Sequence, residues 1–139
     1  KSYESLRLSA YKPTPNDVWT IGWGHTKGVS KGDTCTVSEA DQWLIEDYLE
    51  AKGYLDRLNC PVSLSRDFEG ALVSLLFNCG PSVVAMGSTV GTALRAGNLW
   101  GAWAGMALWR KQAGVDMLGL ARRRAAEMSL AIKNGGLTR

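Results

Sequence analysis

The sequence predicts an α+β fold that is mainly helical, in which a small N-terminal β-hairpin lobe and a larger helical lobe flank a cleft. Residues 18–24 alternate β-forming side chains with glycines, as a strand and a turn do. From residue 38 onward, apolar side chains recur at helical spacing. The 139 residues suffice for one domain. We expect a single domain with a β-lobe at about 9–37, a connecting helix at about 38–58, a helical lobe at about 59–134 and a tail at 135–139.

The chain should open with a short helix that two prolines bring to an end. Ser2 can cap a helix running to about Leu8, because its hydroxyl can accept a hydrogen bond from an unpaired backbone N–H group of the first turn. Pro13 and Pro15 push the residues before them into extended conformations, so the helix cannot continue there. Asp17 then falls in a turn.

The segment after this loop should form a hairpin. Val18–Trp23 is rich in β-formers and is expected to be a strand. Gly22 and Gly24 have no side chains, which leaves room for a neighbouring backbone or a sugar ring. The dipeptide Lys27-Gly28 should close the hairpin.

A long helix should connect the two lobes. Ser38 to Asp41 forms a capping-box pattern, which marks a helix start. Apolar side chains then recur at helical spacing to about Leu58. The tripeptide Asn59-Cys60-Pro61 should end this helix.

The next segment should be the central buried helix. Ser65 can cap it, and Phe68–Cys79 is apolar nearly all round, which is typical of a helix buried on every side. Gly80-Pro81 is a strong helix stop. Three more helices are expected at about 89–96, 100–109 and 118–132. The tryptophans at helical spacing should pack in the core: Trp43, Trp100, Trp103 and Trp109.

The charge is distributed unevenly along the chain. The net charge is +3, with a balance of −3 over residues 1–80 and +6 over residues 81–139. A basic C-terminal half favours an anionic partner, such as nucleic acid, a cell-envelope polymer or the carboxylates of peptidoglycan. The alternative is a solvated basic surface. No run approaches the roughly 18 apolar residues that a membrane span needs.

The cysteines and the histidine do not form a metal-binding pattern. Cys35, Cys60 and Cys79 are scattered, and His25 is the single histidine. This spacing supplies no zinc ligand set. We therefore expect no metal and no cofactor. An odd number of cysteines argues against a complete disulfide framework, so we expect all three thiols to be reduced, with a Cys35–Cys60 disulfide as the alternative.

Three stretches carry a resemblance to a known family. The first is E-x-x-R-L-x-A-Y from Glu4 followed by V-W-T-I-G-W-G-H-T from Val18, and the others lie at residues 71–80 and 119–127. In order and spacing they resemble the phage-type lysozymes, the T4-lysozyme-like muramidases. The resemblance implies that Glu4 is the general acid and that Thr20 helps to position the attacking water. By position alone, Glu4 could instead be a helix-end carboxylate favoured by the helix dipole, and Thr20 a β-branched strand residue.

The second carboxyl group does not follow the spacing of the family. Members of this family carry an Asp nine residues after the Glu and six before the Thr. Counting from Glu4 leads to Pro13 and counting back from Thr20 leads to Thr14, so the loop here is one residue longer. We expect Asp17 to take the second-acid role through a rearranged loop. Otherwise Asp17 is a turn residue that bonds to its own backbone, and a single acid operates.

Further residues are predicted to bind substrate or to hold the fold together. Trp23 can stack on a sugar ring. Asn78 can bond an N-acetyl group or cap its helix. Arg122 and Arg124 open the last helix, where the dipole disfavours cations, so they should contact either substrate or acidic side chains. His25 is expected to be a structural hydrogen-bonding residue that ties the β-lobe to the helical lobe.

These observations and the resemblance predict an endolysin that lyses bacteria by cleaving the β-1,4 bond between N-acetylmuramic acid and N-acetylglucosamine of peptidoglycan with two carboxyl groups. The alternatives are a lytic transglycosylase that uses Glu4 alone, or a non-enzymatic cationic protein that binds the wall or the membrane. We expect a monomer that binds peptidoglycan, and also an anionic cell-envelope surface, but not nucleic acid. It should be made in the host cytoplasm and act on the wall in the periplasm or outside, with no export signal within this sequence.

Overall fold

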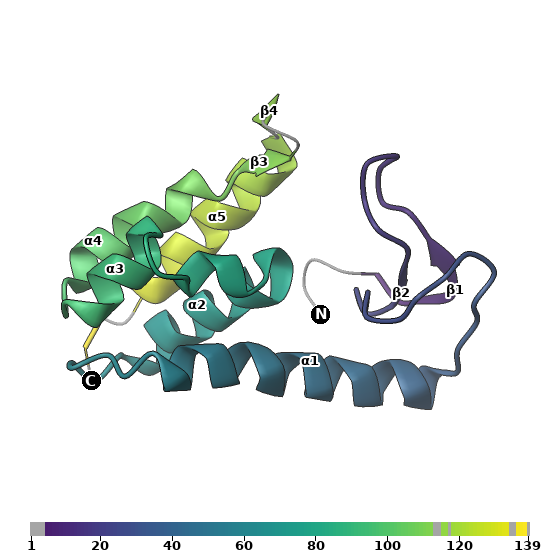
Figure 1. The fold of residues 1–139 in the computed structure, drawn as a ribbon, viewed down its shortest axis with the longest axis horizontal. Helices are drawn as coiled ribbons and strands as arrows, with labels where there is room; N and C mark the ends of the chain where they lie inside the picture. The colour runs from purple at the N-terminus through teal and green to yellow at the C-terminus, as the bar shows by residue number, and fades with distance from the viewer. Residues whose placement is uncertain (1–4, 113–114, 117, 134–135, 139) are drawn as a thin grey trace. The chain divides into compact units, whose positions relative to one another are not determined.

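The computed structural model describes residues 5–112, 115–116, 118–133 and 136–138. The chain forms two compact units, residues 1–49 and 50–139, and the boundary falls within one long helix, α1 (Val37–Arg57). By these ranges the β1–β2 hairpin belongs to the first unit and the helices after α1 belong to the second; Figure 1 labels these elements.

The first unit contains a two-stranded antiparallel sheet. Strand β1 (Arg7–Tyr11) pairs with β2 (Thr20–Gly22) in an irregular register that sets Tyr11 opposite Thr20. On the other side of β1, an isolated bridge joins Ser9 to Thr34. The strand predicted at Val18–Trp23 is present over the shorter range Thr20–Gly22, and the prolines lie in a loop between β1 and β2 as predicted.

Two local predictions for this unit are wrong. Leu8 lies in β1 rather than at the end of a helix, because its carbonyl accepts from the N–H of Cys35 at 2.9 Å, a pairing across more than twenty residues that outweighs local helix propensity. Residues 1–4 lie outside the described part. The hairpin turns at Trp23 and Gly24 instead of Lys27-Gly28, since Ile21 and His25 exchange two 2.9 Å backbone hydrogen bonds.

Helix α1 spans almost the predicted range but begins with a different cap. Thr36 and Glu39 form the capping box: the Thr36 N–H donates to Glu39 Oε1 at 3.0 Å, and the Glu39 N–H donates to Thr36 Oγ1 at 3.1 Å. The cap predicted at Ser38 is therefore displaced by two residues. A Glu three residues after a Thr satisfies two backbone donors at once, which explains why the helix begins after Thr36 rather than after Ser38.

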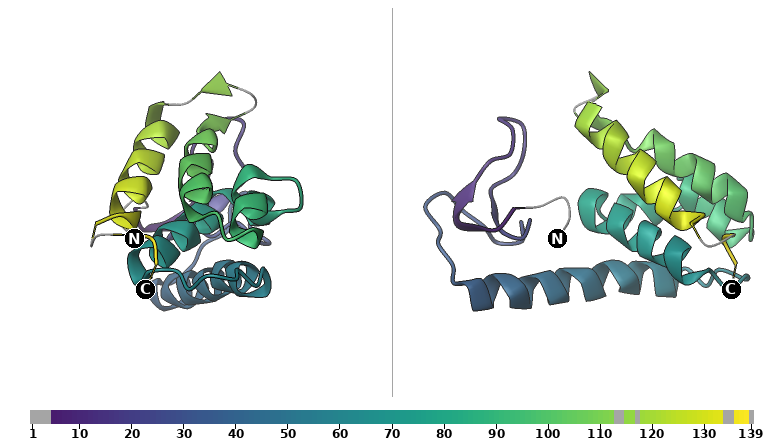
Figure 2. Two further views of the ribbon diagram at one scale, coloured as in Figure 1. Left: turned by 90° about the vertical axis from the view of Figure 1, so that its left-hand side faces the viewer. Right: turned by 180° about the vertical axis from the view of Figure 1, so that it is seen from behind.

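The second unit is built from helices. Its main elements are α2 (Arg66–Cys79), α3 (Thr89–Arg95), α4 (Leu99–Gly105) and α5 (Leu118–Ala131), with short 3-10 turns η1 (Pro81–Val84) and η2 (Met106–Leu108). A two-residue pairing of β3 (Lys111–Gln112) with β4 (Val115–Asp116), which the sequence pattern did not predict, precedes α5. Helix α2 packs against α5, and α3 packs against α4 (Figures 1 and 2).

Helix α2 is the central buried helix that the sequence predicts. The Phe68 N–H donates to Ser65 Oγ at 3.0 Å, which confirms the cap. Phe68, Leu72 and Leu75 are fully buried. Gly80 ends the helix at a φ of 84°, a left-handed conformation that favours glycine. The predicted helices near 89–96, 100–109 and 118–132 are also present, with the second split between α4 and η2.

The tryptophans do not all enter the core. Trp103 and Trp109 pack against it and are partly buried, and Trp43 is partly buried in the first unit. Trp100, however, is 60% exposed, so its predicted core position is wrong. It follows Leu99, which takes the inward position of this helix instead.

Cys35, Cys60 and Cys79 are free cysteines. Within the described ranges, no group of three or more His, Cys, Asp or Glu side chains is placed to hold a metal ion. No helix among the described residues has the length and apolar character needed to cross a membrane.

Candidate functional site

The first unit carries the predicted catalytic residues, except that Glu4 lies outside the described residues. Asp17 is half-buried in a four-residue turn. Its N–H donates to the Thr14 carbonyl at 3.0 Å, and its Oδ2 accepts from the Thr14 hydroxyl at 3.1 Å. A carboxylate held by its own turn is well oriented. Its role as second acid remains a prediction.

Thr20 lies at the start of β2 and is only 5% exposed. Its hydroxyl donates to the Val18 carbonyl at 3.0 Å, which fixes the side-chain rotamer. A hydroxyl that donates in this way keeps acceptor lone pairs, and these can accept a hydrogen bond from a water molecule. The geometry of Thr20 is thus compatible with positioning water.

The turn after β2 is attached to α1 through His25. Its Nδ1 lies 2.8 Å from Asp47 Oδ2, and its ring stacks on Trp43 with centroids 4.7 Å apart and planes 12° apart. His25 is buried. His25 therefore makes a side-chain hydrogen bond to the connecting helix, whereas the predicted tie was to the helical lobe.

Trp23 is attached to the same helix by a second carboxylate. Its indole Nε1 donates to Asp41 Oδ1 at 2.8 Å, and the ring is half-buried. The backbone makes a third close approach, since a Cβ at Gly22 would lie 3.0 Å from the Cβ of Ala40. The turn is therefore held against α1 by packing and by two polar contacts.

Sequence reasoning missed Asp41 and Asp47. Their positions on a long polar helix look like those of ordinary solvated acids. One signal was available: Trp23 and His25 both carry a ring N–H that needs an acceptor once the hairpin packs on a helix.

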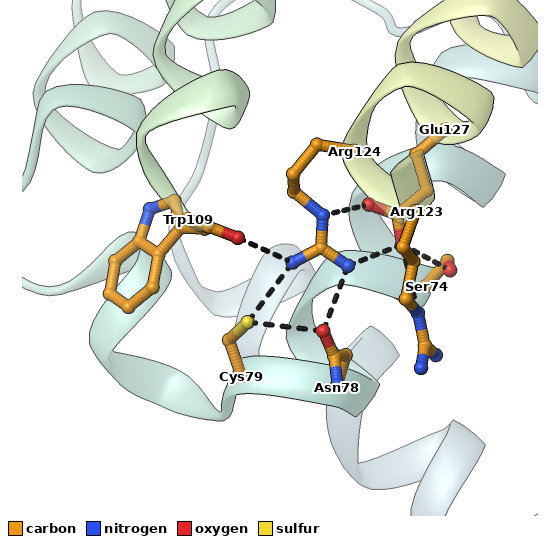
Figure 3. Close-up of polar contacts among 7 residues, drawn as sticks. All are labelled: Ser74, Asn78, Cys79, Trp109, Arg123, Arg124 and Glu127. Carbon is orange, nitrogen blue, oxygen red and sulfur yellow. Dashed lines mark hydrogen bonds and ion pairs between the residues drawn. The ribbon is translucent and has the colours of Figure 1, made fainter. Parts of the chain in front are cut away.

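The second unit contains a buried polar cluster that Figure 3 shows in full. Arg124 and Glu127, one helical turn apart on α5, are 1% and 2% exposed. Arg124 Nε lies 2.6 Å from Glu127 Oε1, and Arg124 Nη2 lies 3.1 Å from Glu127 Oε2. The Ser74 hydroxyl on α2 donates to Glu127 Oε2 at 2.5 Å. Arg124 and Glu127 thus form an ion pair through two N–O contacts, and the Ser74 hydroxyl is a third donor to the carboxylate.

The same guanidinium also closes the end of α2. Its Nη2 donates to Asn78 Oδ1 at 2.8 Å, and its Nη1 donates to Cys79 Sγ at 3.1 Å and to the Trp109 carbonyl at 3.2 Å (Figure 3). Arg124 therefore connects α5, α2 and the segment after η2. With its guanidinium bonded to protein groups and removed from solvent, Arg124 is a structural residue of this unit.

Burial raises the pKa of two groups in this cluster. Loss of hydration raises the pKa of Glu127, and the Ser74 hydroxyl and the guanidinium groups of Arg124 and Arg123 oppose that rise. Burial likewise raises the pKa of the Cys79 thiol, against the opposing influence of Arg124. Cys79 is therefore a protonated thiol of low reactivity in the folded protein.

The predicted substrate-binding residues separate by exposure. Arg122 is exposed on α5 and Asn78 is half-buried at the end of α2. The Asn78 side-chain carbonyl is bonded to Arg124, but an amide also carries an NH₂ group that can donate. The arginines at the start of α5 were expected to contact either substrate or acidic side chains. Glu127 is such an acidic side chain, and Arg123 Nε lies 3.8 Å from its Oε2.

Comparisons with known proteins agree with this architecture. The sequence profile of the phage lysozyme family matches residues 1–127. The chain is 34% identical to the endolysin of Acyrthosiphon pisum secondary endosymbiont phage 1, over 94% of this chain and 90% of the relative. The solved muramidase domain of SpmX from Asticaccaulis excentricus is 33% identical, with a TM-score of 0.76, over 94% of this chain and 89% of that one. The active form of P1 phage endolysin Lyz has a TM-score of 0.80 at 21% identity, over 95% of this chain and 79% of that one, a likeness of fold.

Other relatives are much longer than this chain. The chain spans 55% of the endolysin of Lactococcus phage c2 and 50% of that of Bacillus phage PZA. The similarity therefore covers only about half of each of these two relatives.

Proposed function

We propose that this chain, which belongs to the phage lysozyme family and is a glycoside hydrolase of the muramidase type, cleaves the β-1,4 bond between N-acetylmuramic acid and N-acetylglucosamine in peptidoglycan. The observation that carries the proposal is the placement of Thr20. It is a buried hydroxyl on β2, and the turn that follows is attached to α1 by Trp23 and His25. A preorganised water-positioning group of this kind is what an acid–base glycosidase needs.

In this mechanism two carboxyl groups act together in a single displacement. Glu4 protonates the glycosidic oxygen as the bond breaks, and Asp17, with Thr20, orients and deprotonates the attacking water. The Thr14 hydroxyl that bonds Asp17 Oδ2 holds the carboxylate in one orientation. Attack by water on the face opposite the leaving group inverts the anomeric centre.

Sugar recognition is assigned to three side chains. The Trp23 indole, fixed through its Nε1, presents a flat apolar surface on which a sugar ring can stack. The amide NH₂ of Asn78 can donate to an N-acetyl carbonyl. The exposed Arg122 can pair with the peptide carboxylates of the wall.

Mass spectrometry of digested peptidoglycan tests the proposal. The parent protein should release reducing muropeptides, and both Glu4→Gln and Asp17→Asn should reduce that release by orders of magnitude. Asp33→Asn is a matched control, because Asp33 is another N-terminal loop acid that accepts a hydrogen bond three residues back, from the Ser30 N–H at 2.8 Å. It should retain activity.

Three outcomes would change the conclusion. Anhydro-muropeptides would identify a lytic transglycosylase that needs Glu4 alone. Reducing products with an unaffected Asp17→Asn would mean that Asp17 is only a turn residue. Release that persists in Glu4→Gln would contradict the whole assignment.

We further propose that the protein is made in the host cytoplasm and acts as a monomer on the wall, in the periplasm or outside the cell. Light scattering after size exclusion tests the monomer. Cell fractionation before lysis tests the location.

A further inference from the structure

Two pairs of a cation and an aromatic ring lie on the β1–β2 hairpin. The guanidinium carbon of Arg7 lies 4.7 Å from the centroid of the Tyr11 ring, and Lys12 Nζ lies 5.4 Å from the centroid of the Trp19 ring. Both cations are exposed, and both rings are partly buried. Because a ring face attracts a cation, each ring favours one position of the long side chain above it.

The Arg7–Tyr11 pair lies beside Thr20. Tyr11 is paired directly with Thr20 in the β1–β2 ladder, and Arg7 is paired with Gly22. Side chains directly opposite each other in an antiparallel pair project from the same face, with Cβ atoms about 4.5–5.5 Å apart. The Arg7 side chain reaches along the strand to the Tyr11 ring. Its cation therefore lies over the direct neighbour of the proposed water-positioning residue.

The Lys12–Trp19 pair belongs to the other face of the hairpin. Lys12 follows the last residue of β1 and precedes Pro13, which favours an extended conformation. Successive side chains of an extended backbone point to opposite faces. Lys12, and with it the Trp19 ring that it covers, therefore lies away from the face that Tyr11 shares with Thr20.

The Arg7 guanidinium keeps hydrogen-bond donors for a ligand. Attraction to a ring face does not saturate its five N–H groups. Among the described residues, no hydrogen bond or ion pair occupies these groups. The residues paired with β1 are uncharged, namely Gly22, Thr20 and Thr34. Arg124 differs in this respect, since both of its Nη atoms donate to protein groups in the interior.

We propose that Arg7 binds a carboxylate of the stem peptide that muramic acid carries next to the cleaved bond. The inference rests on the function proposed above, which brings the glycan to Thr20. An arginine side chain can hold a planar carboxylate through two parallel hydrogen bonds, and the peptide carboxylates of the wall are ionised at neutral pH. An uncharged glycan has no group of this kind. Arg7 therefore selects peptide-bearing glycan, at a place separate from Arg122 in the second unit.

Calorimetric titration with two matched probes tests the inference. One probe is a wall tetrasaccharide whose stem peptides have free carboxylates, and the other is the same fragment with these carboxylates converted to amides. All titrations use the Glu4→Gln background to prevent cleavage. This background should bind the acidic probe about tenfold more tightly than the amidated probe. Adding Arg7→Gln should abolish that preference by weakening the binding of the acidic probe alone.

Two further variants separate the carboxylate contact from general attraction. Lys12→Gln is the matched control, because it also removes an exposed cation that covers a ring on this hairpin. It should keep the preference for the acidic probe. Arg7→Lys keeps the charge but not the two parallel donors, so it should restore only part of the preference. Thermal unfolding of each variant should match that of the background, since both side chains are exposed.

Three results would overturn the proposal: equal affinity of the background for the two probes, a preference that survives Arg7→Gln, or an equal loss of preference in Lys12→Gln. The titration measures affinity rather than cleavage, so the two proposals fail separately. If the parent protein released no reducing muropeptides but the preference depended on Arg7, the bond assignment would be wrong and the carboxylate contact would remain.

Discussion

The two units of the molecule hold their polar groups in different ways. In the first unit, single contacts such as Trp23 to Asp41 and His25 to Asp47 attach a small hairpin to one helix. In the second unit, Arg124 and Glu127 share one ion pair that is buried beside the main hydrophobic core. Buried apolar side chains are few in the first unit and many in the second. The first unit therefore depends on individual polar contacts, whereas the second depends on a network that fails together.

The largest effect should come from breaking the buried pair. Arg124→Met removes the guanidinium and leaves Glu127 without its main partner in the core, so the free energy of unfolding should fall by about 3–5 kcal/mol. Urea titration followed by circular dichroism measures it. As a control, Lys52→Met disrupts the half-exposed Lys52–Asp56 pair and should cost less than about 1 kcal/mol. Equal losses for the two variants would show that the network has no special weight.

The next effect should come from the close packing of the hairpin on α1. Gly22→Ala places a Cβ 3.0 Å from that of Ala40 and forces a φ of 66° on a residue with a side chain. We expect a loss of about 1–3 kcal/mol in stability, together with lower activity because Thr20 lies two residues away. Gly28→Ala is the matched control, since its φ is 71° and a Cβ there would meet nothing within 4 Å. If both variants lose the same stability, backbone strain rather than packing is the cause.

A helix cap provides an intermediate case in the second unit. Ser65→Ala removes the acceptor of the Phe68 N–H at the start of α2 and should cost about 1 kcal/mol. Thermal unfolding measures the change. Ser65→Asp should recover most of it, because Asp is also a good cap. A failure of Asp to do so would mean that the Ser65 side chain contributes by something other than capping.

A smaller effect on stability, but a specific effect on function, is expected from Asp41→Ala. It removes the acceptor of the Trp23 indole N–H, so stability should fall by about 1 kcal/mol. If Trp23 is a sugar platform, KM should rise more than kcat falls. Asp41→Asn keeps an acceptor oxygen and should restore much of the affinity. A drop in kcat with an unchanged KM would contradict this role.

The smallest effect should be a pH dependence of the free energy of unfolding, which arises from Glu127 in the second unit. Burial raises the pKa of Glu127 above its ordinary value of 4.5, so the folded protein binds this proton more tightly than the unfolded chain. The stability that Glu127 contributes by protonation is present below pH 4.5 and is lost as the pH rises through the folded-state pKa. Unfolding titrations of the parent and Glu127→Gln across this window should differ in slope, with the parent losing stability relative to the variant as the pH rises.

Parts of the fold were predictable because neighbours in the sequence decide them. The start of α2 follows from the reach of the Ser65 hydroxyl to an N–H three residues on, and its end follows from a glycine that adopts a positive φ. The length of α1 follows from the helical spacing of apolar side chains. The structural hydrogen bond of His25 was predicted in kind but not in partner: it reaches the connecting helix rather than the helical lobe, and its acceptor, Asp47, is 22 residues away.

What the sequence alone determined is the set of helices, the hairpin region and the family pattern around Thr20. The tertiary structure decided which residues meet: Leu8 became a strand residue by pairing with Cys35, Trp100 turned outward because Leu99 took the inward position, and Arg124 was buried against Glu127, Asn78 and Cys79. The physical reason is the distance along the sequence between the groups that decide each feature. Caps, stops and spacing depend on a few adjacent residues, whereas burial and long-range pairing depend on groups that only folding brings together.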